Sequence, residues 1–275
     1  MKQIKEWISG LCLMLALGAS AQALAESSQD AVWNASLRTE HFADRPIAEG
    51  DDVIVLEAPR RAEDAAVVPV AVSAAFPQSE ERYIRTITLL IDNNPVPLAG
   101  RFRFGPKSGR ADIAMRVRVN AYTPMRAIAE TNDGKLHMSR VFIKASGGCS
   151  APAGADLETA MQRLGRMKLA TRNEDDNDGA MLTQLRISHP NVTGMQMDQV
   201  TRLYAPAHFV KEVEVSFNGT PVMSAETDIS ISENPSFRFY FVPEESGELV
   251  ATVTDSNGLT FTHTEVIAGE TTAAN

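Results

Sequence analysis

Cys149 is the residue of this chain best suited to chemistry, because a thiolate is a strong nucleophile. It follows Gly147 and Gly148 and comes directly after a strand-like run at 139–145. Glycines impose few steric limits on the backbone, and small neighbours give a thiol no local framework to pack against. The sequence therefore predicts that Cys149 lies on a mobile, accessible loop.

The other cysteine, Cys12, lies in a segment with the pattern of a secretory signal peptide. Two lysines give a positive start, a short apolar run follows, and residues 23–25 read Ala-Leu-Ala, an A-x-A cleavage site. We expect residues 1–25 to be removed and the mature protein to begin near Glu26. Because no later stretch approaches the ~20 apolar residues of a membrane span, we expect a soluble exported protein.

Export would place Cys149 in an oxidising compartment without a partner thiol in its own chain. The thiol then has to stay free, pair with another molecule or carry an adduct. At a reference pKa of about 8.5 only a few per cent is thiolate near neutral pH. Arg140 and Lys144 are the nearest cations in sequence and would lower that pKa modestly. We expect a partner enzyme to activate the thiol and to bring any redox cofactor. We expect no cofactor in this chain.

The charge of the chain excludes one class of partner. The formal net charge is −9, and it becomes −10 when the signal peptide leaves with two lysines and one glutamate. Such a chain has no electrostatic footprint for a phosphate backbone, so we expect no nucleic-acid binding. Basic partners fit this charge better.

Metal, haem, hydrolase and nucleotide sites lack a motif in this chain. There is no Cys-x-x-Cys, His-Glu-x-x-His, Gly-x-Ser-x-Gly or Walker-type loop. The acidic run at 173–178 lacks the glycine and glutamate of an EF-hand loop, which favours a solvated hairpin tip. The histidines are scattered without ligand spacing, so we expect no metal site and expect the one before Pro190 to fix a loop. They are His41, His137, His189, His208 and His263.

The elements that must position the thiol have the pattern of short strands. Runs of strand length, rich in β-branched residues, are separated by turn signals at 105–106, 123–124 and 132–134. This spacing predicts a β-sandwich. The expected strands of the first half are 53–56, 67–72, 85–91, 113–119, 125–131 and 140–145.

A second set of strands follows a different segment. Leu157, Met161 and Leu164 share one face of an expected short helix at 155–166, a stripe that we interpret as packing. Strands are then expected at 181–188, 212–217, 237–242, 249–255 and 260–266, with hairpin turns at 218–219 and 256–258. We expect an all-β chain of two domains, 26–150 and 168–268, with a linker at 151–167 and a disordered tail at 269–275.

Short motifs in a fixed order resemble a known family. The first half resembles the sulfur-carrier subunit SoxY of the thiosulfate-oxidising system, through Leu56-Glu57-Ala58-Pro59, Asp92-Asn93-Asn94-Pro95 and the Gly147-Gly148-Cys149 arm. The second half resembles its partner SoxZ, through His189-Pro190, Pro206-Ala207-His208-Phe209, Phe217-Asn218-Gly219-Thr220-Pro221-Val222 and Ser232-Glu233-Asn234-Pro235. Together these motifs cover nearly the whole expected mature chain.

The chain is therefore similar to fused SoxYZ-like carriers that are associated with periplasmic quinoprotein dehydrogenases. The resemblance implies two Ig-like β-sandwich domains, with a covalent sulfur intermediate on Cys149 and with Gly147 and Gly148 giving the arm flexibility. It implies a carrier that is not itself an enzyme, served by Sox-type enzymes, a quinoprotein dehydrogenase or a cytochrome c. The SoxY pattern ends in Gly-Gly-Cys-Gly-Gly, whereas here Ser150 and more than a hundred further residues follow Cys149. The arm is thus tethered at both ends and has to enter a partner as a bent loop.

Two other classes of function remain open. In the first, the chain is a non-covalent adaptor for a quinoprotein dehydrogenase or cytochrome c, and Cys149 is dispensable. In the second, it is a thiol redox enzyme, although a single thiol has to borrow its resolving partner from elsewhere. Loss of function in Cys149→Ser without unfolding would select the carrier.

Overall fold

The computed structural model describes residues 29–105, 107–152, 157–173, 179–198, 202–243 and 245–268. The expected signal peptide, residues 174–178 of the acidic run and the expected tail at 269–275 lie outside these residues. No helix in the described part of the chain is both long and apolar enough to cross a membrane.

The chain divides into two compact units, Met1–Asp44 and Arg45–Asn275. The described part of the first unit contains a π-helical turn, η1 (Trp33–Leu37), which continues into α2 (Arg38–Phe42). Within this unit the rings of Trp33 and Phe42 lie 6.1 Å apart. The second unit contains all of the strands and Cys149.

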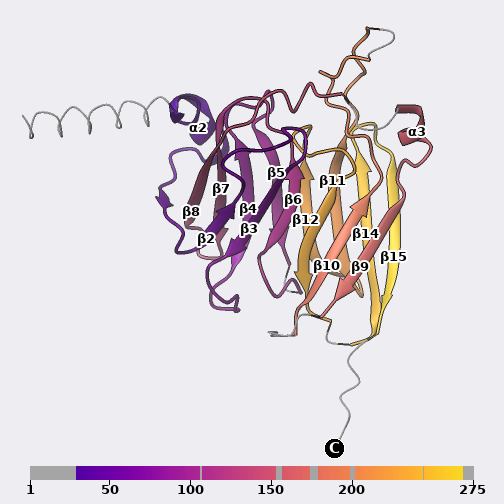
Figure 1. Cartoon of the computed structure of the whole chain (residues 1–275). Coiled ribbons are helices and arrows are strands. Elements are labelled where there is room, and N and C mark those ends of the chain that lie inside the picture. The colour runs from indigo at the N-terminus through magenta and orange to yellow at the C-terminus, as the bar shows by residue number, and fades with distance from the viewer. Residues whose placement is uncertain are drawn as a thin grey trace, which may run out of the picture. The chain divides into compact units, whose positions relative to one another are not determined.

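The larger of two sheets in the second unit has nine strands (Figure 1). Only the pair at one end of the order, β1 with β8, is parallel. The order is β1 (Ile47–Glu49), β8 (Leu136–Ile143), β7 (Thr123–Thr131), β4 (Ile84–Ile91), β5 (Leu98–Phe104), β12 (Thr220–Thr227), β11 (Val210–Phe217), β14 (Gly247–Asp255) and β15 (Thr260–Ile267).

The smaller sheet has six strands, all antiparallel, and packs against the larger one (Figure 1). In the middle of this sheet β6 and β13 pair at a single position, Ala114 with Arg238. The order is β2 (Ile54–Glu57), β3 (Val68–Ala74), β6 (Ile113–Val117), β13 (Ser236–Phe241), β10 (Met181–Ile187) and β9 (Met167–Arg172).

One hydrophobic core fills the space between the sheets and continues through both halves of the chain. Strands such as β14 alternate buried and partly exposed residues, as a strand with one covered face does. Phe102 of β5 and Phe237 of β13 pack with ring centroids 6.1 Å apart, so an aromatic contact joins the halves. The predicted all-β sandwich class is confirmed, and the two sandwiches are fused into continuous sheets.

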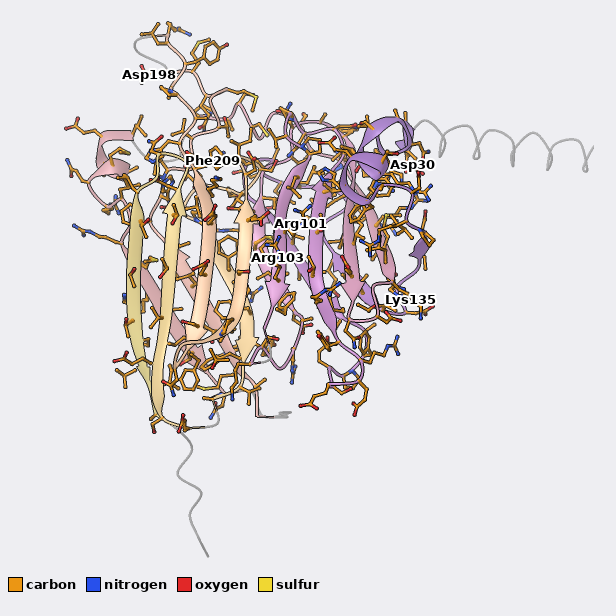
Figure 2. The ribbon with its side chains drawn as sticks, turned by 180° about the vertical axis from the view of Figure 1, so that it is seen from behind. Asp30, Arg101, Arg103, Lys135, Asp198 and Phe209 are labelled. Carbon is orange, nitrogen blue, oxygen red and sulfur yellow. The ribbon has the colours of Figure 1, made fainter. Side chains whose placement is uncertain are left out.

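The halves meet along β5 and β12, which pair from Met223 opposite Phe104 to Thr227 opposite Gly100. On the outer face of this junction Glu226 forms salt bridges with Arg101, at 3.5 Å, and with Arg103, at 2.8 Å. Figure 2, seen from the opposite side, shows the two arginines side by side at the boundary between the early and the late strands.

Most expected strands are found, but three local expectations are wrong. Residues 123–124 begin β7 and are not a turn, although Pro124 has no N–H to donate. Among the described residues of the expected helix at 155–166, α3 covers only Leu157–Met161, and a turn follows. Leu157 and Met161 are 40% and 41% exposed, so their stripe does not pack into the core as interpreted.

Candidate functional site

Cys149 lies in a turn after β8, and its side chain is fully buried, with an exposed fraction of 0%. The expectation of an accessible loop is therefore wrong in this conformation. The Gly148 N–H donates to the carbonyl of Val119 at 3.0 Å, and a Cβ at Gly148 would overlap the carbonyl of Ala65. Because Gly148 has no Cβ, the segment can approach the neighbouring backbone at a distance that no other residue type would allow at this position. Gly147 has φ +81°, a conformation that favours glycine. The flexibility that we expect Gly147 and Gly148 to give the arm stays a prediction.

A loop of the second half, residues 191–196, holds the segment that follows the thiol. The Thr193 hydroxyl donates to the carbonyl of Cys149 at 2.6 Å, and the Gln196 amide donates to the carbonyl of Ala151 at 2.8 Å. The Gln196 side-chain oxygen accepts from the Thr193 N–H at 3.2 Å, which fixes both donors relative to each other. The two halves of the chain thus build the surroundings of Cys149 together.

A buried arginine, Arg118, reaches the same place from the loop after β6. It is 1% exposed, and its guanidinium donates to the carbonyls of Gly148 and Asn191, each at 3.4 Å. Burial lowers the pKa of Arg118, although charges that include Cys149 oppose the shift. The guanidinium remains charged at neutral pH, so it places a cation beside the thiol segment.

The electrostatics of this site keep the thiol protonated. Burial raises the pKa of Cys149 to about 11, and the positive charge of Arg118 offsets only part of that rise. At pH 7 about one molecule in ten thousand then carries the thiolate. The expected influence of Arg140 and Lys144 is not found: the cation that acts on the thiol is Arg118, and Arg140 lies 3.6 Å from Glu49. Reaction at Cys149 therefore requires the segment to open.

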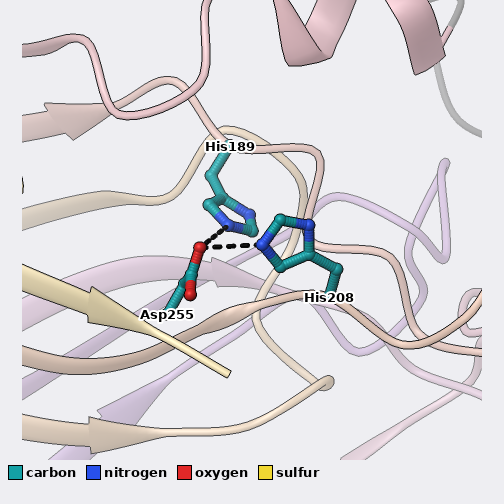
Figure 3. A group of neighbouring side chains, drawn as sticks. All are labelled: His189, His208 and Asp255. Atoms are coloured by element: carbon teal, nitrogen blue, oxygen red, sulfur yellow. Dashed lines mark hydrogen bonds and ion pairs between the residues drawn. The ribbon is translucent and has the colours of Figure 1, made fainter. Parts of the chain in front are cut away.

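Two of the five histidines, which are scattered in the sequence, meet in the fold. His189 and His208 lie edge to face with ring centroids 4.7 Å apart, and both approach the buried carboxylate of Asp255 (Figure 3). The Nε2 atom of His208 lies 2.7 Å from Asp255, and that of His189 lies 3.6 Å away. Sequence spacing gave no sign of this cluster because its members come from three separate segments.

Hydrogen bonds around this cluster set the proton positions. Nδ1 of His189 accepts the Asn191 N–H at 3.0 Å, so in the neutral ring the proton is on Nε2, facing Asp255. A metal at that Nε2 would need the lone pair that the proton occupies, so the hydrogen bond from Asn191 disfavours metal binding at this atom. At 3.6 Å from Asp255 the Nε2 atom makes no hydrogen bond with another described residue. The prediction of no metal site stays a prediction. His189 also fixes its loop, as expected from its place before Pro190.

The charges of the cluster follow from burial. Burial, together with nearby His208, lowers the pKa of His189 to about 4. Burial would raise the pKa of Asp255, yet hydrogen bonds from His208 and from the N–H groups of Leu259 and Asn257 hold it below its usual value. The cluster is thus a neutral His189 beside a carboxylate, and Asn191 connects it to Arg118 and the thiol segment.

Comparison with protein families accounts for both halves. The family model "Sulfur oxidation protein SoxY" matches residues 38–149, and "Sulphur oxidation protein SoxZ" matches residues 168–266. The chain belongs to the fused SoxYZ-like proteins. Its SoxY-like half ends on Cys149, and the 191–196 loop that holds the thiol segment belongs to the SoxZ-like half. No curated protein matches the chain.

Solved structures give partial similarities to this SoxYZ-like chain. The sulfur carrier protein SoxY from Chlorobium limicola f thiosulfatophilum is 24% identical over 44% of this chain and 93% of its own, with a TM-score of 0.33. A superoxide reductase (neelaredoxin) from Ignicoccus hospitalis is 25% identical over 34% of this chain and 79% of its own, with a TM-score of 0.31. Fibronectin(III)-like modules of Clostridium thermocellum CbhA are 8% identical over 81% and 97% of the two chains, with a TM-score of 0.23.

Sequence reasoning found the thiol but missed what surrounds it. Arg118 stands in the expected strand 113–119, where alternation with the buried residues at 113, 115, 117 and 119 would point it outward. The strand ends at Val117, and the chain then turns Arg118 inward. Thr193 and Gln196 carried no signal, because their partners are backbone carbonyls more than forty positions away.

Proposed function

We propose that this SoxYZ-like protein is a periplasmic carrier that holds a sulfur intermediate covalently on Cys149 and presents it to partner oxidoreductases. The observation that carries the proposal is that the SoxY match ends on the only cysteine outside the expected signal peptide. The membership of both halves in the sulfur-oxidation families supports it further.

The chemistry of loading needs a partner. When the Cys149 thiol forms an S–S bond with a sulfur anion such as thiosulfate, one proton and two electrons leave. A partner oxidoreductase, a Sox-type enzyme or a cytochrome c, has to take the electrons, because a single thiol without a disulfide has nothing in its own site that can accept them. The carrier itself contributes a tethered sulfur atom and no catalytic centre.

Burial of the thiol gives the carrier two states. In the closed state described above, Cys149 is covered and its pKa is about 11, so it neither loads nor reacts. In the open state the segment after β8 leaves Thr193 and Gln196, and the bent loop presents Cys149 to a partner. Residues 147 and 148 are the glycines about which that loop would turn.

The test is the intact mass of the protein isolated from its native periplasm without reducing agents. We expect residues 1–25 to be missing and a sulfane or sulfonate mass to be located on Cys149 by peptide fragmentation. Cys149→Ser is expected to lose the added mass and the activity of the sulfur-oxidising system while the protein stays folded, although the buried hydroxyl lowers its unfolding temperature. A bare thiol during active sulfur oxidation would argue against the carrier.

A second candidate is a non-covalent adaptor for a quinoprotein dehydrogenase or cytochrome c. The complete burial of Cys149 favours it, because a thiol that stays covered cannot accept a substrate. In that case Cys149→Ser would retain both co-purification with the dehydrogenase and activity. The carrier requires activity to be lost in the same variant, so one substitution separates the two functions.

A further inference from the structure

A groove runs along the outer face of the six-stranded sheet where the two halves meet. Its volume is about 730 Å³. The small side chains of Ala71 and Ala114, which pair across β3 and β6, lie at its centre. Around them stand three exposed arginines from three neighbouring strands, Arg116 of β6, Arg238 of β13 and Arg186 of β10. The sheet thus presents a cluster of cations around a shallow depression.

The register of the strands brings a fourth cation next to this cluster. Arg186 lies directly opposite Lys168 of β9, and Arg238 pairs with Gln184, so that Arg186 and Arg238 are diagonal neighbours. Like charges directly opposite each other in a sheet are destabilising. An anion bound over Arg186 and Lys168 would reduce the repulsion between them and so stabilise the sheet.

Within the described part of the chain, the side chains of Arg186, Arg238 and Lys168 make no hydrogen bond or ion pair with another residue, and that of Arg116 donates only to the carbonyl of Asn234, at 3.1 Å. Glu57 is the single carboxylate among the described residues that line the groove. These cations therefore have their hydrogen-bonding groups available to a partner.

The opposite face of the molecule is built differently. On the nine-stranded sheet Arg101 and Arg103 share Glu226, and Arg85 donates to Glu130 at 2.6 Å. Those cations are matched by carboxylates of the same sheet, whereas no described carboxylate pairs with Arg116, Arg186, Arg238 or Lys168 of the six-stranded sheet. The contrast shows a basic face on a chain whose formal net charge is −9.

We infer that this basic face, Arg116, Arg186, Arg238 and Lys168 around the groove, docks an acidic surface of a partner protein. Complementary charge steers and orients association, and arginine pairs with carboxylates through two parallel hydrogen bonds. The arginines are exposed and spread over three strands, which suits several carboxylates on a surface better than one small enclosed anion. The inference rests on charge and register, and it stands whether or not Cys149 carries sulfur.

The test is the binding of a fluorescently labelled decaglutamate peptide, followed by anisotropy at low and at physiological salt. The test variant is Arg186→Gln with Arg238→Gln, and the matched control is Arg101→Gln with Arg103→Gln. Both remove two arginines from an outer sheet face and change the net charge equally. We expect the test variant to bind about tenfold more weakly and the control to bind like the unmodified protein.

Three results would overturn the inference. The first is equal weakening in both variants, and the second is no binding to the unmodified protein at low salt; either would mean that the face has no preference for carboxylates. The third is displacement of the peptide by sulfate far beyond that by chloride at equal ionic strength, which would identify a small-oxyanion site. Retained binding in the control with loss in the test variant supports the docking face.

Discussion

Thr193 and Gln196 decide, at the scale of single residues, how well the thiol is covered. Each donates from the SoxZ-like half to a backbone carbonyl, that of Cys149 itself or that of the residue two positions after it. Leaving the buried carbonyl of Cys149 or the part-buried carbonyl of Ala151 without its donor costs free energy, so removal of either side chain favours the open segment. The population of the closed state can therefore be changed by substitutions at Thr193 and Gln196, without a substitution at Cys149.

Thr193→Val and Gln196→Met are expected to speed the modification of Cys149 by a thiol reagent. Each lost hydrogen bond should raise the open population, and with it the labelling rate, about fivefold. The measurement is the rate of reaction with a chromogenic disulfide at fixed pH. Thr254→Val, which removes an exposed hydroxyl contact on β14, serves as the control and should label like the unmodified protein. Unchanged rates in all three variants would show that these donors do not hold the segment.

His189 makes the stability of the fold depend on pH. Its pKa is about 4 in the fold against a reference value of 6.5, so between these values the unfolded chain binds a proton that the folded chain does not. Stability is therefore full above pH 6.5 and falls as the pH drops toward 4. Between pH 7 and pH 5 this residue should cost about 2 kcal/mol.

His189→Asn keeps a hydrogen-bond acceptor near the Asn191 N–H but cannot titrate. Urea unfolding at pH 7 and pH 5 should show that the variant loses about 2 kcal/mol less than the unmodified protein over this range. His263→Asn, on the edge strand β15, is the matched control and should keep the full loss. Equal losses in both variants would remove His189 as the cause.

At the scale of elements, the strands of the sandwich were largely predictable and the junction was not. Runs such as 85–91 and 249–255 have β-branched residues with clear turn signals on both sides, and the structure places β4 and β14 there. The strands β1 and β9, which lie at sheet edges, were missed, and so were the central strands β5 and β12. Gly100 and two arginines interrupt β5, and Pro221, Ser224 and Ala225 give β12 little β-propensity.

The two central strands that were missed, β5 and β12, pair with each other, which explains why local patterns failed there. Each is held by pairing on both sides, β5 between β4 and β12, and β12 between β5 and β11. Such strands owe their conformation to neighbours distant in sequence, a contribution that no window of residues contains. The burial of Cys149 was hidden for the same reason, because Ala65, Val119 and Thr193 approach its segment from separate loops.

At the scale of the whole molecule, the shared core should make the two halves unfold together. Phe241→Ala removes a buried ring whose aromatic neighbour, Phe217 at 5.4 Å, belongs to the same half. We expect a loss of about 3–5 kcal/mol. Hydrogen exchange in urea should show the same loss in β4 and β7 of the other half. The control Val266→Ala, at a position 75% exposed, should leave both halves unchanged.

Unchanged protection in β4 and β7 of Phe241→Ala would mean that the halves open independently. In that case the strands would form continuous sheets, but the two halves would not unfold cooperatively. Cys149 would then become exposed whenever the SoxZ-like half unfolded alone. Coincident loss in all slow amides would instead tie the cover to the global stability of the fold.

The cover over Cys149 comes from a half of the same chain, so dilution cannot remove it. A thiol shielded by a separate subunit is exposed in whatever fraction of the complex has dissociated, and that fraction grows as the protein becomes scarce. In a fused chain the effective concentration of the shielding half is fixed by the connection and is independent of expression level. The exposure of the thiol then depends on how often residues 147–151 open, and a rarely made copy is covered as well as an abundant one.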